Sequence, residues 1–323
     1  MFDLNSFNCK VSTIKPDDFD KVWDKWIKEV RAVPNNIEIV KEEVQIDGFG
    51  KIIDFYYDSV NGAKVFAKLY LRWEAARDVV AYYHGHNSYI DHEDNVWHCM
   101  NLVAAGFNVF AIDMRFQNGK TIDNTPYRFM DYPSACFNID ELNHCYNKYL
   151  DQDALKLIDI IKDPSLFKDI NGTPLANQKL IVAGPSQGGG LSMMVASLDN
   201  RVDLSLSDVP SDCAIKDRII NKEGKYGVIK DFLTDHPELT DVVMRNQDYF
   251  DVINMTDKMA CPTICSVGTI DKICPPAYFY QAYEKIKTKK ALEVYEGYGH
   301  GGFEEIHLPK KIKFAKDVLN INY

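Results

Sequence analysis

The chain has 323 residues, of which 46% are hydrophobic and 26% are charged, and these proportions are ordinary for a folded globular protein. The 47 acidic residues outnumber the 37 basic ones and give a net charge of −10, which argues against nucleic acid or an anionic membrane surface as the main partner. No stretch approaches about 18 uninterrupted apolar residues, and the N-terminus lacks the basic and apolar regions of a signal peptide. We therefore expect no membrane segment and a cytoplasmic location.

The cysteines agree with a reducing compartment. None of them forms a C-x-x-C pair, and in a chain of this size scattered cysteines favour free thiols over a disulfide framework. The eight positions are Cys9, Cys99, Cys136, Cys145, Cys213, Cys261, Cys265 and Cys274.

The first part of the chain predicts one helix followed by hairpins. Apolar residues at helical spacing indicate an amphipathic helix from Pro16 to about Val30. Three extended segments follow, separated by turn residues at 47–50 and at Asn61-Gly62. The segments are 37–46, 52–60 and 63–71. We expect them to form an antiparallel edge of a larger sheet.

From Asp78 onward the pattern changes to alternating strands and helices. Apolar runs predict strands at 79–83, 107–112, 180–183, 203–206, 262–267 and 292–295. Helices are predicted at 93–105, 153–162, 191–198, 275–286 and 309–319. Repeated strand–helix units imply a mainly parallel sheet with helices on both faces, and hence an α/β fold. Two long insertions, near 113–150 and 210–256, interrupt one domain that spans 1–323.

Gly184-Pro185-Ser186-Gln187-Gly188 stands between a predicted strand and a predicted helix. That context is typical of a nucleophile elbow, in which a G-x-S-x-G motif presents its serine on a sharp turn. Small residues beside the serine let the backbone pass close to its neighbours, and the start of the helix favours developing negative charge. Ser186 is therefore the candidate nucleophile.

An acid and a base follow in the order that this motif requires. Asp271 comes directly after the predicted strand 262–267, where a carboxylate can orient an imidazole. His300 follows the last predicted strand and is flanked by glycines. Asp208 is a rival acid because it also follows a strand, whereas His307 is expected to be structural. We predict a Ser186–His300–Asp271 triad.

The oxyanion of an acyl-transfer reaction needs backbone donors. We expect the N–H of Gln187, the residue after the nucleophile, and that of His86, in the loop after an early strand. The same loop offers a competing interpretation, because a histidine cluster with acidic neighbours can bind zinc. The cluster comprises His84, His86, His92 and His98, with Asp91, Glu93 and Cys99 nearby. Its spacing does not match the tight metallo-β-lactamase motif, and we predict no metal.

These residues resemble carbohydrate esterase family seven, the acetyl xylan esterase and cephalosporin C deacetylase group of α/β-hydrolases. The similarity covers nearly the whole chain. It rests on Gly184-Pro185-Ser186-Gln187-Gly188-Gly189, Asp271 with Cys274-Pro275-Pro276, His84-Gly85, His300, and the N-terminal Phe19-Asp20 with Trp23. The chain departs from the family pattern at Phe116, where R-G-Q-G has lost its first glycine, at His86, which replaces a tyrosine, and at Gly301, which replaces a glutamate.

The resemblance implies an α/β-hydrolase fold and a serine esterase that removes acetyl groups from small sugars or related alcohols without a cofactor. It also implies that His86, Arg115 and Gln117 bind substrate and that the chain forms a homohexamer. A carboxylesterase, thioesterase or peptidase on the same fold, or a binding protein with an inactive triad, are the alternatives.

Overall fold

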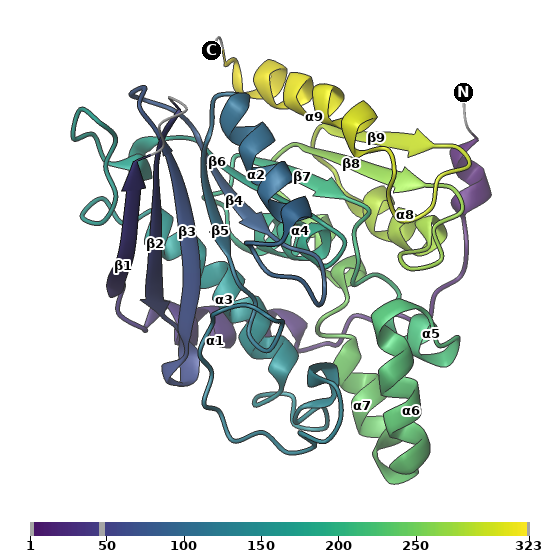
Figure 1. Ribbon diagram of the computed structural model, residues 1–323. Helices are drawn as coiled ribbons and strands as arrows, with labels where there is room; N and C mark the ends of the chain where they lie inside the picture. Colours follow the sequence, from purple (N-terminus) through teal and green to yellow (C-terminus); the bar gives the residue numbers. More distant parts are fainter. Residues whose placement is uncertain (1–2, 45–48, 322–323) are drawn as a thin grey trace.

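The computed structural model describes residues 3–44 and 49–321. Its strands are β1 (Ile37–Val44), β2 (Gly50–Asp58), β3 (Lys64–Arg72), β4 (Val79–Tyr83), β5 (Asn108–Ile112), β6 (Leu180–Pro185), β7 (Leu204–Asp208), β8 (Thr263–Gly268) and β9 (Lys290–Tyr295). In the described residues they form a nine-stranded sheet in the order β1-β2-β3-β5-β4-β6-β7-β8-β9 (Figure 1). Pairing is antiparallel from β1 to β5 and parallel from β5 to β9. The predicted mainly parallel sheet with an antiparallel N-terminal edge is confirmed.

The antiparallel edge follows the predicted hairpin signals. Asn61 and Gly62 lie between β2 and β3 with φ angles of 57° and 71°, the left-handed conformations that these two residue types tolerate best. Alternate residues of β2 are buried, so one face of this strand packs on the core and the other is partly solvated. The predicted turn at 47–50 and the end of the first predicted strand fall partly on residues 45–48, which lie outside the described residues.

Helices cover both faces of the sheet (Figure 1). They are α1 (Phe19–Arg31), α2 (Glu93–Ala104), α3 (Tyr146–Ile161), α4 (Gln187–Leu198), α5 (Ile215–Ile220), α6 (Gly227–Asp235), α7 (Thr240–Gln247), α8 (Pro276–Lys285) and α9 (Glu304–Leu319). Apolar residues of α1, α3, α4 and α8 share one core with the sheet, and those of α2 and α9 share the other. Strands β4 to β8 are buried throughout or nearly so, and β4, β5 and β6 accordingly consist mainly of apolar residues, whereas β7 alternates leucine with buried serine.

Two predicted helix boundaries were wrong, each for a physical reason. Helix α3 begins at Tyr146, seven residues before the predicted start, because its early positions are buried in spite of their polar character. Helix α9 begins at Glu304 and carries Pro309 inside it, whereas a proline more often stands in the first turn. Lys311 and His307 both pair with the buried Asp208, and these contacts hold the first turns of α9 in place. The insertion at 210–256 is largely helical and contains α5, α6 and α7.

Candidate active site

Ser186 lies between β6 and α4 on a strained turn. Its φ and ψ angles are 56° and −116°, outside the ordinary regions for a residue with a side chain. Its backbone N–H donates to the Asp208 carbonyl at 2.9 Å, which fixes the turn against the end of β7. A side chain on Gly184 or Gly188 would overlap the Tyr83 carbonyl oxygen, so the sharp turn requires glycine at both positions. This geometry is that of the nucleophile elbow that the motif predicted.

Asp271 and His300 are joined by a hydrogen bond between the aspartate Oδ2 and the histidine Nδ1, 2.7 Å apart. The other aspartate oxygen accepts from the backbone N–H groups of Ile273 and Cys274 at 2.7 and 2.9 Å. Three bonds therefore fix a carboxylate whose side chain is only 1% exposed, and the carboxylate fixes the imidazole. Because Nδ1 faces Asp271, Nε2 is the ring nitrogen that can exchange a proton with other groups. The loops after β8 and β9 thus bring together two of the residues that the sequence predicted as partners.

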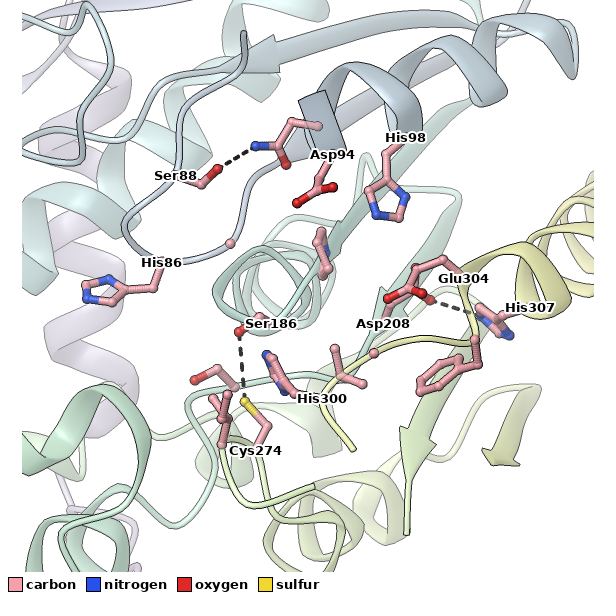
Figure 2. A pocket seen from close by; sticks show the side chains of 18 of the residues that line it. His86, Ser88, Asp94, His98, Ser186, Asp208, Cys274, His300, Glu304 and His307 are labelled. Atoms are coloured by element: carbon pink, nitrogen blue, oxygen red, sulfur yellow. Dashed lines mark hydrogen bonds and ion pairs between the residues drawn. The ribbon is translucent and has the colours of Figure 1, made fainter. Parts of the chain in front are cut away.

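Cys274 is the site residue that our reasoning from the sequence missed. Its Sγ lies 3.9 Å from Ser186 Oγ (Figure 2), and it also contacts His300 closely enough to share a hydrogen bond. In this arrangement the serine hydroxyl faces the thiol, and the imidazole lies beside both. The signal was present in the sequence, because Cys274 is only three residues after Asp271 and so shares its loop.

The thiol and the imidazole perturb each other's protonation. Burial alone would lower the pKa of His300, but its hydrogen bonds to Asp271 and Cys274 outweigh burial and raise that pKa. Burial would raise the pKa of the Cys274 thiol, but the Arg218 guanidinium and His300 together lower it. Positive charge on His300 and negative charge on the sulfur therefore favour each other.

The predicted oxyanion donors lie on the other side of the serine. His86 Nδ1 is 3.2 Å from Gln187 Oε1, so the two predicted residues are in contact. In the part of the chain that the structure describes, no acceptor takes the backbone N–H of His86 or Gln187, which leaves both free for a ligand. The amide groups of Gln187 and Gln117 pair with each other at 3.1 Å, and Gln117 also accepts from the backbone N–H of Asn87 at 3.0 Å. Gln117 thus holds the oxyanion loop from behind and does not line the cavity.

Arg115 also lies behind the cavity, fully buried, and does not line it. Its guanidinium binds both oxygens of Asp153, at 2.7 and 2.6 Å, and one oxygen of Asp123 at 2.8 Å. These contacts occupy the fork of the side chain and tie the segment after β5 to helix α3. The next residue, Phe116, has a φ of 54°, a conformation that glycine adopts without strain.

Ser186, His300 and His86 open on one cavity of about 750 Å³, and Asp271 does not line it. Figure 2 shows Ser186, Cys274 and His300 together on one side, with Asp94 and His98 of α2 across from them. The beginning of α9 forms a second wall, and the insertion at 210–256 contributes a third. The wall residues are Asp94, Asn95, Trp97 and His98 from α2, Glu304, Glu305, His307, Leu308 and Lys311 from α9, and Arg218, Gly224 and Lys225 from the insertion.

The rival acid Asp208 has other partners. It is buried between Lys311 and His307, with its Oδ1 3.0 Å from His307 Nε2, and it accepts from Ser266 Oγ at 3.3 Å. Burial opposes ionisation, but the charges of Lys311 and His307 outweigh it and hold the pKa of Asp208 well below its usual range. His307 is therefore a packed ion-pair residue inside α9 and not part of the His300 pair.

The histidine cluster does not assemble into a metal site. His84 Nε2 accepts from the Met114 backbone N–H at 3.0 Å, and His86 turns to Gln187, while His98 lies on α2. Over residues 3–44 and 49–321, no three His, Cys, Asp or Glu side chains come together in a way that could hold a metal ion. Within the same ranges, no helix is long and apolar enough to cross a membrane.

Two sequence comparisons identify relatives of this chain. A family model for acetyl xylan esterase matches residues 3–318. Acetyl esterase Axe7A of Xylanibacter ruminicola is 27% identical over 155 residues, which are 47% of this chain. That match spans about a third of the relative, 32% of its length.

Solved structures give a longer match. Acetyl xylan esterase 1 from Thermoanaerobacterium sp. JW/SL YS485 superposes with a TM-score of 0.83 at 26% identity, covering 97% of this chain and 98% of that one. Acetyl xylan esterase from Paenibacillus sp. R4 has the same TM-score of 0.83 at 24% identity, over 96% and 98% of the two chains. Est1E from Butyrivibrio proteoclasticus, at 15% identity and a TM-score of 0.57 over 83% and 99%, shares the fold alone. Since the family model covers nearly its whole length, the chain belongs to the acetyl xylan esterase family.

Proposed function

We propose that this protein is a serine esterase that removes acetyl groups from small sugars or related alcohols, with cephalosporin C as a further candidate substrate. The observation that carries the proposal is the strained Ser186 elbow, which shares one cavity with His300, the histidine that Asp271 holds by a hydrogen bond. Membership of the acetyl xylan esterase family supports acetyl as the acyl group.

In the proposed mechanism Ser186 Oγ attacks the ester carbonyl carbon while His300 Nε2 takes the hydroxyl proton. Asp271 keeps the proton on Nδ1 and stabilises the imidazolium through the 2.7 Å bond. The backbone N–H groups of Gln187 and His86 donate to the carbonyl oxygen as it becomes negative. The ester C–O bond then breaks, and His300 protonates the leaving alcohol. Water repeats the sequence on the acetyl-enzyme and releases acetate.

The experiment that tests this proposal is hydrolysis of p-nitrophenyl acetate by Ser186→Ala. We expect essentially all turnover to be lost without unfolding, because alanine fits the same turn but has no hydroxyl. Ser197→Ala is the matched control: Ser197 is also on α4, but its hydroxyl donates to the Met193 carbonyl at 2.7 Å, away from the cavity. Retained activity in Ser186→Ala with normal activity in the control refutes the assignment.

The alternatives predict different readouts. A panel of p-nitrophenyl esters should show a sharp preference for acetyl, whereas a rate that rises with acyl length indicates a general carboxylesterase. Hydrolysis of thioester or peptide substrates would indicate a thioesterase or a peptidase. A binding protein with an inactive triad leaves the serine unlabelled by a fluorophosphonate probe. We propose that no cofactor or metal takes part, so a chelator should leave the rate unchanged.

Three further expectations stay proposals. We propose a homohexamer in the cytoplasm, in which one α/β-hydrolase domain over 1–323 carries the two insertions. His86 is the one predicted substrate-binding residue that lines the cavity, and we propose that it alone of the three contacts substrate. Light scattering that gives the mass of one 36.9 kDa subunit contradicts the hexamer.

A further inference from the structure

The cavity holds a thiol to which the proposed mechanism gives no role. Of the eight cysteines, all of which lie in the described residues, Cys274 is the one that lines the cavity. It is 5% exposed, so a small molecule inside the cavity reaches it, whereas the exterior surface does not present it. Cys9, the single cysteine that is not fully buried, lies elsewhere and provides a comparison.

A buried cation faces this sulfur. Arg218 of α5 is 2% exposed, and its Nη2 lies 3.9 Å from Cys274 Sγ. Nη2 also donates to the Ile273 carbonyl, and Nη1 donates to Ser211 Oγ at 3.3 Å. Within the described residues, no carboxylate oxygen makes an ion pair with this guanidinium, whose Nε has no hydrogen-bond partner, and the charges of Asp212 and Glu223 act on it only from farther away. A buried positive charge with no carboxylate in direct contact stabilises an anion beside it, and Cys274 supplies that anion when it ionises.

The groups around Cys274 distinguish it from the other cysteines. Arg218 comes from the insertion, His300 from the loop after β9, and Asp271 from the thiol's own loop, while Cys213 also packs nearby. Burial raises the pKa of the other thiols, as it does for Cys213. For Cys274 the effect of burial is outweighed by Arg218 and His300, so its pKa is lowered in spite of the nearby Asp271 carboxylate.

We propose that Cys274 is a covalent modification site for small carbon electrophiles, and that an adduct on its sulfur blocks Ser186. With iodoacetamide, the sulfur attacks the carbon that carries iodine, a C–S bond forms, and iodide leaves with the bonding electrons. The thiol proton passes to His300 and then to water. Because Sγ lies 3.9 Å from Ser186 Oγ, the added acetamide group occupies the space in which an ester must approach the hydroxyl. The inference extends beyond the proposed esterase activity, since the adduct itself needs no ester substrate.

The test treats the whole protein with iodoacetamide at pH 6.5 and at pH 8.5 and measures the label on each cysteine by peptide mass spectrometry. At pH 6.5 we expect several-fold more label on Cys274 than on Cys9, because Arg218 and His300 lower the pKa of the Cys274 thiol and so raise its thiolate fraction. Burial raises the pKa of Cys9, so its labelling should need the higher pH. Turnover of p-nitrophenyl acetate should fall in step with the Cys274 label.

Two variants test whether the label on Cys274 is the cause of the lost turnover. Cys274→Ser should keep its own starting activity through the same treatment, whereas Cys9→Ser should lose activity as the wild type does. The inference is overturned if Cys274 stays unlabelled while Cys9 reacts, if complete labelling of Cys274 leaves turnover unchanged, or if Cys274→Ser is inactivated at the wild-type rate. Failure of the esterase proposal is distinguishable, because the Cys274 label is then still found by mass while p-nitrophenyl acetate is not hydrolysed from the start.

Discussion

Replacing Arg115 by methionine should cost stability and leave substrate binding intact. Arg115 is fully buried and holds Asp153 through two bonds and Asp123 through one. Methionine fills a similar volume but leaves two buried carboxylates without their cation, and breaking a buried ion pair costs about 3–5 kcal/mol. With an unfolding entropy of about 2.1 cal/mol/K per residue, the chain has about 0.7 kcal/mol/K, so Tm should fall by about 4–7 °C.

Calorimetry gives the Tm, and hydrolysis of p-nitrophenyl acetate well below it gives KM. The control is Arg128→Met, because Arg128 also pairs with two carboxylates, Asp140 and Glu141, but its side chain is 53% exposed. Exposed pairs contribute little, so Tm of the control should change by less than about 2 °C. Arg115→Lys should fall between, since one ammonium cannot match the bidentate fork. An unchanged Tm with a raised KM in Arg115→Met refutes this reasoning and restores the substrate-binding role.

Three more predictions concern the elbow and the triad. Asp271→Asn should keep the fold but lower kcat on the order of 10⁴-fold, because an amide N–H facing His300 Nδ1 imposes the wrong tautomer; a near-normal kcat in a folded variant contradicts the triad. Gly188→Ala should lower kcat, and it should lower the free energy of unfolding in urea by about 1–3 kcal/mol, because the added methyl group overlaps the Tyr83 carbonyl oxygen. Full stability of this variant would show that the turn relaxes freely. Cys274→Ala should move the acid limb of kcat/KM to lower pH: burial then lowers the pKa of His300 with less opposition, and the neutral base persists in more acid solution. An acid limb that stays in place contradicts the coupling of thiol and imidazole.

The sequence predicted the sheet and the order of the candidate site residues along the chain, because both can be recognised from local sequence patterns. Apolar residues in the buried strands β6 and β8 indicated the positions after which Ser186 and Asp271 stand, and the partly buried strand β9 indicated the position of His300. Each residue then reaches the same end of the sheet because parallel strands end together. The 2.7 Å bond between Asp271 and His300 therefore follows from topology more than from any local feature.

What the sequence did not predict depends on contacts between distant segments. From the sequence, the family resemblance implied that Arg115 binds substrate, but in the structure its guanidinium binds Asp153, which is 38 residues later in the chain. The start of α9 was misplaced because its ion pairs to Asp208 outweigh the local preference of Pro309 for a first turn. Likewise, the ionisation of Cys274 depends on Arg218, which lies on α5 in the insertion at 210–256, 56 residues away in the sequence. The sequence pattern of one segment does not show which residues of a distant segment contact it.

The backbone at Ser186 has a consequence for how this position is maintained. A φ of 56° with a ψ of −116° costs a side-chain-bearing residue about 1–3 kcal/mol, and glycine alone adopts such angles freely. A glycine here would thus give a sturdier protein with no hydroxyl to attack an ester. Stability favours glycine at this position, whereas the proposed reaction needs serine, so the nucleophile that we propose is present at a cost in stability.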